Sequence, residues 1–193
     1  YRRAAELNPN YATMNHWFGI FLSDIGKHNE AIKLTVKASE LDPQSMIIKS
    51  TVAHTFLMAE QNTQALKYCD KTFEIDPYFS FALWFKHAKI NERNSKENID
   101  HIKEAIRRYP NQPMHRKTLA EVYWNIGDRE AAMEQVIELL DRYHDSFRKV
   151  HFADLYFVMG KPDHAYRWLE KAIEAKEGNV LTYGVLPTLK KYQ

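Results

Sequence analysis

Histidine, cysteine and carboxylate side chains are the residues of this chain that could carry catalysis or bind a metal ion. The 193-residue sequence holds nine histidines, but no two stand three or four residues apart, the spacing that places two ligands on one helical face. His16 and His54 could meet only if the fold brings separate segments together. We therefore read the histidines as single polar residues rather than as a metal site.

Cys69 is the only cysteine, which excludes an internal disulfide and a cysteine-based zinc site. It falls on or near an apolar helical stripe, so we expect a small buried side chain rather than a nucleophile.

The acidic residues show no catalytic pairing. Four glutamates fall on predicted solvent faces near Lys or Arg, and we expect them to form charge pairs on helix surfaces. They are Glu30, Glu40, Glu74 and Glu134. The sequence contains no glycine-rich phosphate loop, no paired-histidine zinc-protease motif and no nucleophile elbow. We expect no catalysis, no cofactor and no metal.

Composition limits the remaining classes of function. Apolar residues make up 45% and aromatic residues 13% of the chain, which is enough for a packed core. The net charge is +2 with both signs interspersed, which argues against a nucleic-acid-binding surface. No apolar run approaches the roughly 20 residues of a membrane span, and no secretory leader opens the chain. We expect a cytoplasmic segment with no membrane contact.

The elements that position these side chains recur at a fixed period. Pro9, Pro43, Pro77 and Pro110 follow one another at 34, 34 and 33 residues. A second series keeps nearly the same spacing, and it runs through Gly19, Ala53, His87, Ala120 and Ala153. Self-similarity at one period indicates a stacked repeat architecture.

Each period contains two helical stripes separated by a short turn. The apolar spacing predicts paired helices over 11–24 and 29–41, 45–59 and 63–75, 79–91 and 96–108, 113–126 and 129–143, and 146–159 and 162–175. No alternation typical of a strand occurs. The prediction is an all-α solenoid.

The repeating motif resembles the tetratricopeptide repeat. Phe18-Gly19 with Leu22 and Leu119-Ala120 with Tyr123 fit the first helix of that family, and Ala31 with Ala38 fits the second. The resemblance implies a right-handed superhelical solenoid forming one array over 1–193. Its parts would be a leading half repeat (1–10), five repeats (11–44, 45–78, 79–111, 112–145 and 146–179) and a C-terminal capping helix (180–193).

The third repeat departs most from the pattern. Lys86-His87 stands where Leu-Gly is expected, and Asn98 stands where Ala is expected. The opening, YRRAAELNPNYATMNHWFGIFLSDIG, resembles arrays that follow winged-helix or nucleotide-cyclase domains in bacterial regulators. Because residues 1–9 match only the second half of a repeat and no initiator Met is present, we expect an excised fragment, and the resemblance agrees with an upstream domain. A sensing or dimerising role in a bacterial transcription regulator or nucleotide cyclase is the alternative function.

In the resembled family, the first helices line a concave groove that takes a peptide or a helix of another protein. Transferred to this chain, the groove-facing offsets give the predicted partner-binding residues His16, Ile20, His54, Phe81, Trp84, Asn91, Lys117, Glu121, Trp124 and Phe157. A carboxylate clamp is not expected, because His16 and Ile20 occupy first-repeat clamp positions and Lys117 is the only cation in the set. Two alternatives stay open: the aromatic residues pack in the core, or the groove holds the C-terminal segment or a second copy in a homodimer.

Overall fold

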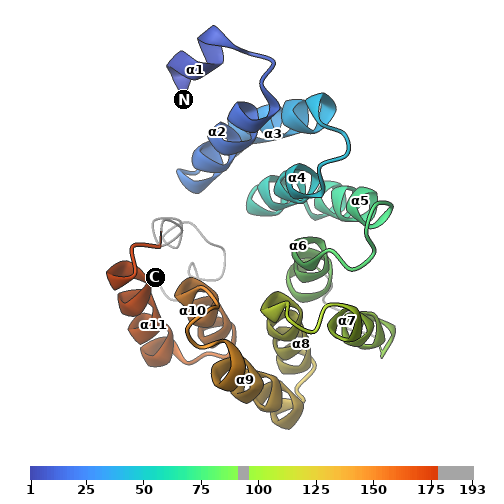
Figure 1. Ribbon diagram of the computed structural model, residues 1–193, viewed down its shortest axis with the longest axis vertical. Helices are drawn as coiled ribbons and strands as arrows, with labels where there is room; N and C mark the ends of the chain where they lie inside the picture. The colour runs from blue at the N-terminus through green and yellow to red at the C-terminus, as the bar shows by residue number, and fades with distance from the viewer. Residues whose placement is uncertain (91–95, 178–193) are drawn as a thin grey trace. The chain divides into compact units, whose positions relative to one another are not determined.

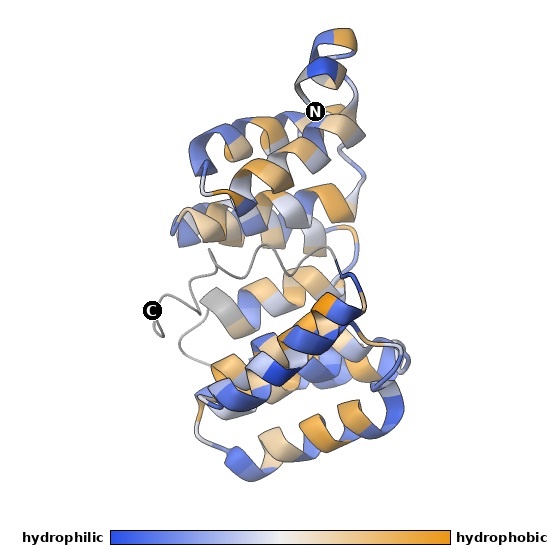
Figure 2. Ribbon diagram, turned by 90° about the vertical axis from the view of Figure 1, so that its left-hand side faces the viewer, coloured by the Kyte–Doolittle hydropathy of each residue, from blue (hydrophilic) through white to orange (hydrophobic). Residues whose placement is uncertain are grey.

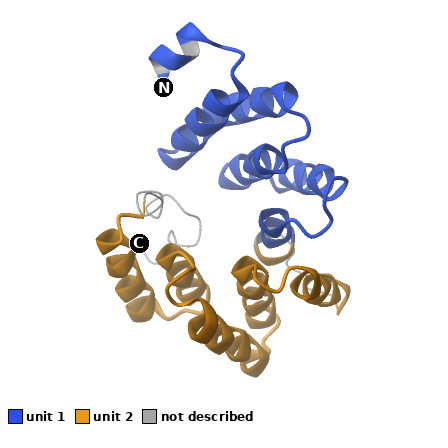
Figure 3. Ribbon diagram, in the orientation of Figure 1, with its two compact units in different colours: residues 1–86 blue, residues 87–193 orange. Residues whose placement is uncertain are grey.

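The computed structural model describes residues 1–90 and 96–177, and every regular element in these ranges is a helix. The chain divides into two compact units, residues 1–86 (unit 1) and 87–193 (unit 2) (Figure 3). The predicted all-α class and the helical-repeat solenoid are confirmed.

Unit 1 is built from two layers of helices. One layer contains the first helices of successive repeats, α2 (Ala12–Asp24), α4 (Met46–Met58) and α6 (Ser80–Leu83). The other contains α3 (His28–Leu41) and α5 (Asn62–Phe73), while α1 (Arg2–Leu7) packs against α2. α2 contacts α4 and α4 contacts α6, so the first helices of neighbouring repeats in unit 1 lie next to one another (Figure 1).

Unit 2 repeats this arrangement. Its first helices are α8 (Pro113–Asn125) and α10 (Lys149–Val158), which contact each other. Its second helices are α7 (Lys96–Arg108), α9 (Arg129–Tyr143) and α11 (Pro162–Glu174). Hydrophobic and hydrophilic residues alternate around the helices, as expected for elements with one buried side (Figure 2).

Small residues allow the paired helices to approach closely. A Cβ atom added at Gly19 of α2 would lie 2.4 Å from the Thr35 Cγ2 atom of α3, inside contact distance. The corresponding alanines of later repeats, Ala53, Ala120 and Ala153, are fully buried. The small-residue series therefore marks the crossing points of the helix pairs.

The turns that follow the first helices of the first, second, fourth and fifth repeats share one geometry. In the first repeat, the Lys27 amide donates to the Leu22 carbonyl (2.8 Å) and the Gly26 amide to that of Ser23 (3.0 Å). This is the Schellman motif, and Gly26 takes the positive φ (79°) that it requires. Gly127 in the fourth repeat and Gly160 in the fifth also have positive φ and make the same pair of hydrogen bonds. In the second repeat, Glu60 takes the place of the glycine, with a φ of 60°.

Three features differ from the prediction or lie beyond it. The first helix of the third repeat is α-helical only to Leu83 and continues as a π-helix, η1 (Trp84–Ile90), in the repeat that is one residue short. The helix expected over 146–159 begins at Lys149, because residues 144–146 form a turn and the Phe147 amide bonds back to the Tyr143 carbonyl (2.8 Å). The capping helix expected over 180–193 lies outside the described residues.

Candidate functional site

An aromatic cluster in unit 1 contains the predicted site residues Phe81, Trp84 and His54. Their rings lie 6.3, 5.1 and 5.4 Å from the ring of Phe85, measured between centroids. Phe85 itself is buried with Ala53, Cys69 and Ala82 in the core, whereas Phe81, Trp84 and His54 are half-buried. The three predicted residues therefore rest on a packed core while keeping part of their surface exposed.

The two other predicted residues of unit 1 lie on α2. The His16 ring shares a hydrogen bond with the Thr51 hydroxyl of α4 (2.9 Å), and Ile20, one helical turn later, is half-buried. Burial lowers the pKa of His16. Burial, with the charge of His28 as a smaller cause, lowers the pKa of His54 to about 4. Both imidazoles are therefore neutral at pH 7, and each contacts a different partner, Thr51 for His16 and Phe85 for His54.

In unit 2, the predicted residues Lys117 and Glu121 form a buried ion cluster with Asp154. The Lys117 ammonium pairs with Glu121 one turn along α8 and with the Asp154 carboxylate of α10 at 2.6 Å. All three side chains are at most 5% exposed. The cluster joins the two first helices of unit 2, and its carboxylates outnumber its ammonium group two to one.

The remaining predicted residues occupy different environments. Trp124 is half-buried, and the Arg129 guanidinium lies 3.8 Å from the centre of its ring. Phe157 is 1% exposed and packs edge-on against Tyr166 at 5.4 Å. Asn91 lies outside the described residues. Partner binding by the ten predicted residues stays a prediction.

Two polar arrangements were missed by sequence reasoning. In unit 2, the ring nitrogens of His87 in η1 and His101 in α7 lie 3.2 Å apart. The residues are fourteen apart in sequence on separate helices, so no helical spacing could reveal them. The Glu177 carboxylate accepts hydrogen bonds from the amides of Lys149 (2.8 Å) and Val150 (3.1 Å), which caps α10.

A carboxylate in unit 1 also escaped notice. Asp24 is the last residue of α2, and it is half-buried. Burial alone raises its pKa from 3.8 to about 6. The position of Asp24 in the sequence could have indicated an unusual carboxylate, since a carboxylate at a helix C-terminus lies at the negative end of the helix dipole.

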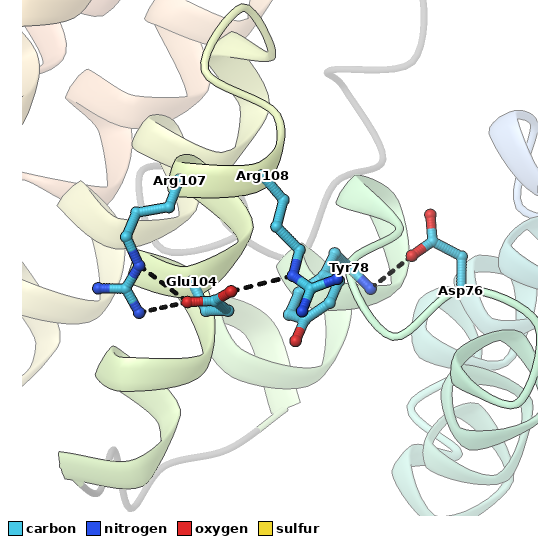
Figure 4. Close-up of polar contacts among 5 residues, drawn as sticks. All are labelled: Asp76, Tyr78, Glu104, Arg107 and Arg108. Carbon is cyan, nitrogen blue, oxygen red and sulfur yellow. Dashed lines mark hydrogen bonds and ion pairs between the residues drawn. The ribbon is translucent and has the colours of Figure 1, made fainter.

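The charged residues predicted on the surface do lie there. Glu30, Glu40, Glu74 and Glu134 are exposed, and Glu30 pairs with Lys27 at 3.5 Å. In unit 2, the Glu104 carboxylate accepts hydrogen bonds from Arg107 (2.8 Å) and Arg108 (2.9 Å) along α7 (Figure 4). These pairs follow helical spacing and indicate solvated helix faces rather than a reaction centre.

Cys69 has the predicted structural character. Its side chain is fully buried, and burial raises the pKa of its thiol to about 12. A thiol that stays protonated is a poor nucleophile, because the thiolate is the reactive form.

Within residues 1–90 and 96–177, no three metal-binding side chains lie close enough to share an ion. Over the same ranges, no helix combines the length and apolar character needed to cross a membrane.

Comparison with solved structures identifies the fold. A tetratricopeptide-repeat protein of Thermus thermophilus superposes with a TM-score of 0.62 at 21% identity, covering 93% of this chain and 99% of that one. One from Parabacteroides merdae gives 0.67 at 14% identity, covering 97% and 74%. YrrB, described as a tetratricopeptide-repeat protein with an unusual peptide-binding site, gives 0.53 at 17% identity, covering 95% of each chain.

In sequence comparison, no protein-family model and no curated protein matches the chain. None of the three structures is described as a regulator or a cyclase, so that context stays a prediction. The period, the paired helices and the structural neighbours agree, and the chain has the fold of a tetratricopeptide-repeat array.

Proposed function

We propose that the array is a protein-interaction module that binds a peptide or helix of a partner protein and catalyses no reaction. The observation that carries the proposal is the cluster of Phe81, Trp84 and His54 around Phe85. Aromatic side chains that are already ordered by a core lose little entropy when a partner covers their exposed surface.

The electrostatics of this face favour apolar contact. His16 and His54 are neutral at pH 7, because burial lowers the pKa of each. Phe81 and Trp84 add rings without charge. A partner segment with apolar or aromatic side chains would therefore meet no desolvated charge on these residues.

The fold is consistent with this role, since a solenoid presents the first helices of successive repeats side by side. YrrB, one of the structural neighbours, is described as having a peptide-binding site. Trp124 is a second candidate anchor, and Arg129 already covers one face of its ring. A reducing compartment such as the cytoplasm suits the single buried free thiol, Cys69.

The experiment selects heptapeptides from a displayed random library on the full chain and measures the affinity of synthetic winners by calorimetry. Trp84→Ala is expected to weaken binding about 30-fold, the loss of a typical hot-spot residue, with Trp84→Phe intermediate. Trp124→Ala is expected to have a smaller effect, because Arg129 shields the ring.

The matched control is Ile137→Ala, which removes an apolar side chain that is 54% exposed on the second-layer helix α9. It should leave affinity unchanged. Far-UV circular dichroism must show equal helicity for all variants. Unchanged affinity in both tryptophan variants would remove the proposal.

A further inference from the structure

One indole ring of unit 2 has two cations beside it. The Arg129 guanidinium lies 3.8 Å from the centre of the Trp124 ring, and the Lys161 ammonium lies 6.0 Å from it. Trp124 belongs to α8, Arg129 begins α9 and Lys161 directly precedes α11, so the group combines residues from the fourth and fifth repeats. Trp124 and Lys161 are half-buried and Arg129 is exposed, which leaves the group open to a ligand.

Neither Arg129 nor Lys161 forms an ion pair with a carboxylate within residues 1–90 and 96–177. Asp128, directly before Arg129, instead caps α9 by accepting a hydrogen bond from the Ala131 amide (3.1 Å). Two like charges beside one ring repel each other, and an anion bound next to both would offset that repulsion. The group therefore has the electrostatic character of an anion site.

The corresponding lysine of the first repeat has a counter-ion. Lys27 and Lys161 each follow the glycine of the turn between two paired helices. Lys27 pairs at 3.5 Å with Glu30, which stands three residues later. Three residues after Lys161 the chain has His164, whose ring stacks on that of Tyr156 with 5.3 Å between centroids. The charge that the first repeat neutralises within its own turn is thus left for another group in the fifth.

The Arg129 side chain is already held in place for binding. Besides lying against the Trp124 ring, its guanidinium donates a hydrogen bond to the Trp124 carbonyl. A guanidinium has five N–H donors in a planar fork, so donors remain for a carboxylate. An arginine that is ordered before binding loses little entropy when it pairs. The ring offers apolar surface to the methylene groups that carry the carboxylate of an aspartate or glutamate.

We propose that Trp124, Arg129 and Lys161 form a docking site for an aspartate or glutamate side chain of the bound partner segment. The carboxylate pairs with the two cations, and its methylene groups lie against the Trp124 ring. The inference rests on the proposed function, since it takes the occupant to be part of a protein, and it specifies that the partner carries an acidic residue.

Three pools of fluorescent heptapeptides test the proposal. Their flanking residues are randomised, and the pools differ only in the central residue, which is Glu, Gln or Lys. Acetylated and amidated ends remove the terminal charges. Fluorescence polarisation with the full chain is expected to show the Glu pool binding about 10-fold more tightly than the Gln pool, as for one charge-assisted hydrogen bond. The Lys pool should bind most weakly, and added salt should reduce the differences.

Arg129→Gln and Lys161→Gln should each lower the preference for the Glu pool, and the double variant should abolish it. Replacing both residues by glutamate should reverse the order, so that the Lys pool binds more tightly than the Glu pool. Trp124→Ala should also lower the preference, because Arg129 loses the ring against which it lies. The matched control is Arg167→Gln, which removes the same charge from an exposed position on α11 and should leave the preference unchanged. Far-UV circular dichroism must show equal helicity for all variants.

The outcomes separate this inference from the proposed function. Equal affinities for the Glu and Gln pools, or a Glu preference that survives the double glutamine variant, would overturn the docking site. If Trp84→Ala weakens all pools under those outcomes, the aromatic cluster still binds peptides. If the double variant removes the Glu preference while Trp84→Ala changes nothing, the docking site stands and the aromatic cluster does not. Absence of binding by every pool would overturn both.

Discussion

The first helices of units 1 and 2 use the same register positions for opposite chemistry. Two positions of the first helix recur every 33 or 34 residues along the chain. The first position holds His16, Ser50, Trp84, Lys117 and Val150. The second holds Ile20, His54, Ala88, Glu121 and Asp154. In unit 1 these positions hold uncharged polar, aromatic and aliphatic side chains. In unit 2 they hold two apolar side chains, Ala88 and Val150, and an ammonium with two carboxylates that pair with it in the interior.

The difference shows that the repeat fixes where a side chain lies but leaves its electrostatics open. The charges of Lys117, Glu121 and Asp154 are directed at each other, and they hold α8 against α10. The unit 1 positions carry no charge at pH 7, and three of them, Ile20, His54 and Trp84, are half-buried, which suits apolar contact with a partner. We therefore expect mutations at equivalent positions to affect mainly stability in unit 2 and mainly binding in unit 1.

Lys117→Met should have the largest effect. It leaves the carboxylates of Glu121 and Asp154 buried without their shared cation, and loss of one partner from a buried ion pair costs about 3–5 kcal/mol of unfolding free energy. The equivalent unit 1 variant, Ser50→Ala, should change stability by less than about 1 kcal/mol, because the buried Ser50 hydroxyl has no hydrogen-bond partner.

Urea unfolding followed by circular dichroism measures both variants. The triple variant Lys117→Met, Glu121→Leu, Asp154→Leu provides the control, because an apolar replacement of a whole buried cluster is often neutral or stabilising. If Lys117→Met were no more destabilising than Ser50→Ala, the claim that these positions stabilise unit 2 more than unit 1 would be contradicted.

A second test uses pH, because two groups of unit 1 titrate with opposite effects on stability. The native pKa of His54 is about 4, below its ordinary 6.5, so the unfolded chain binds more protons and stability rises between pH 4 and 6.5. The native pKa of Asp24 is about 6, above its ordinary 3.8, so the native state binds more protons and stability falls between pH 4 and 6.

The two contributions should partly cancel in the natural chain. In Asp24→Asn, the unfolding free energy should still rise with pH by about 2–3 kcal/mol because of His54. In His54→Gln, it should still fall with pH by about 1–2 kcal/mol because of Asp24, after solvent screening is allowed for. Urea midpoints measured from pH 4 to 6.5 give the slopes relative to the natural chain. Parallel curves for all three proteins would contradict the assigned burial of both groups.

Much of this fold follows from the repeat period, and the exceptions have physical causes. Apolar spacing predicts α7 and α9 with the observed bounds, since the apolar residues of both recur at helical spacing. The π-helix η1 is not predicted, because a change in hydrogen-bond register leaves no mark in apolar periodicity. The start of α10 was also missed, since its cap, Glu177, stands 28 residues further along the chain.

The candidate site was predicted less completely. Family offsets select His54, Phe81 and Trp84, and the structure brings these residues together around Phe85. The same offsets select Lys117 and Glu121, but the sequence alone does not show that Asp154 would complete a fully buried cluster with them. The burial of a side chain depends on how two helices pack against each other. The positions transferred from the family specify only where a residue stands within its own helix.

The turns that close the first helices provide the smallest predicted effect. Unit 2 uses Gly127 and Gly160 at the left-handed position, whereas unit 1 uses Gly26 in its first repeat and Glu60 in its second. A left-handed conformation costs a residue with a Cβ atom roughly 1 kcal/mol. Glu60→Gly should therefore raise the unfolding free energy by about 0.5–1 kcal/mol, after the greater chain entropy of glycine in the unfolded state is subtracted.

Glu60→Ala separates backbone strain from the loss of the glutamate side chain, because alanine keeps the Cβ atom and hence the strain. Thermal unfolding should place Glu60→Gly above both Glu60→Ala and the natural chain. The reverse substitution in the first repeat, Gly26→Ala, should lower stability by about 1 kcal/mol, since the φ of 79° there disfavours any side chain. Equal stability of the glycine and alanine variants at position 60 would show that this turn relaxes without cost, and the second repeat would then not be the strained one.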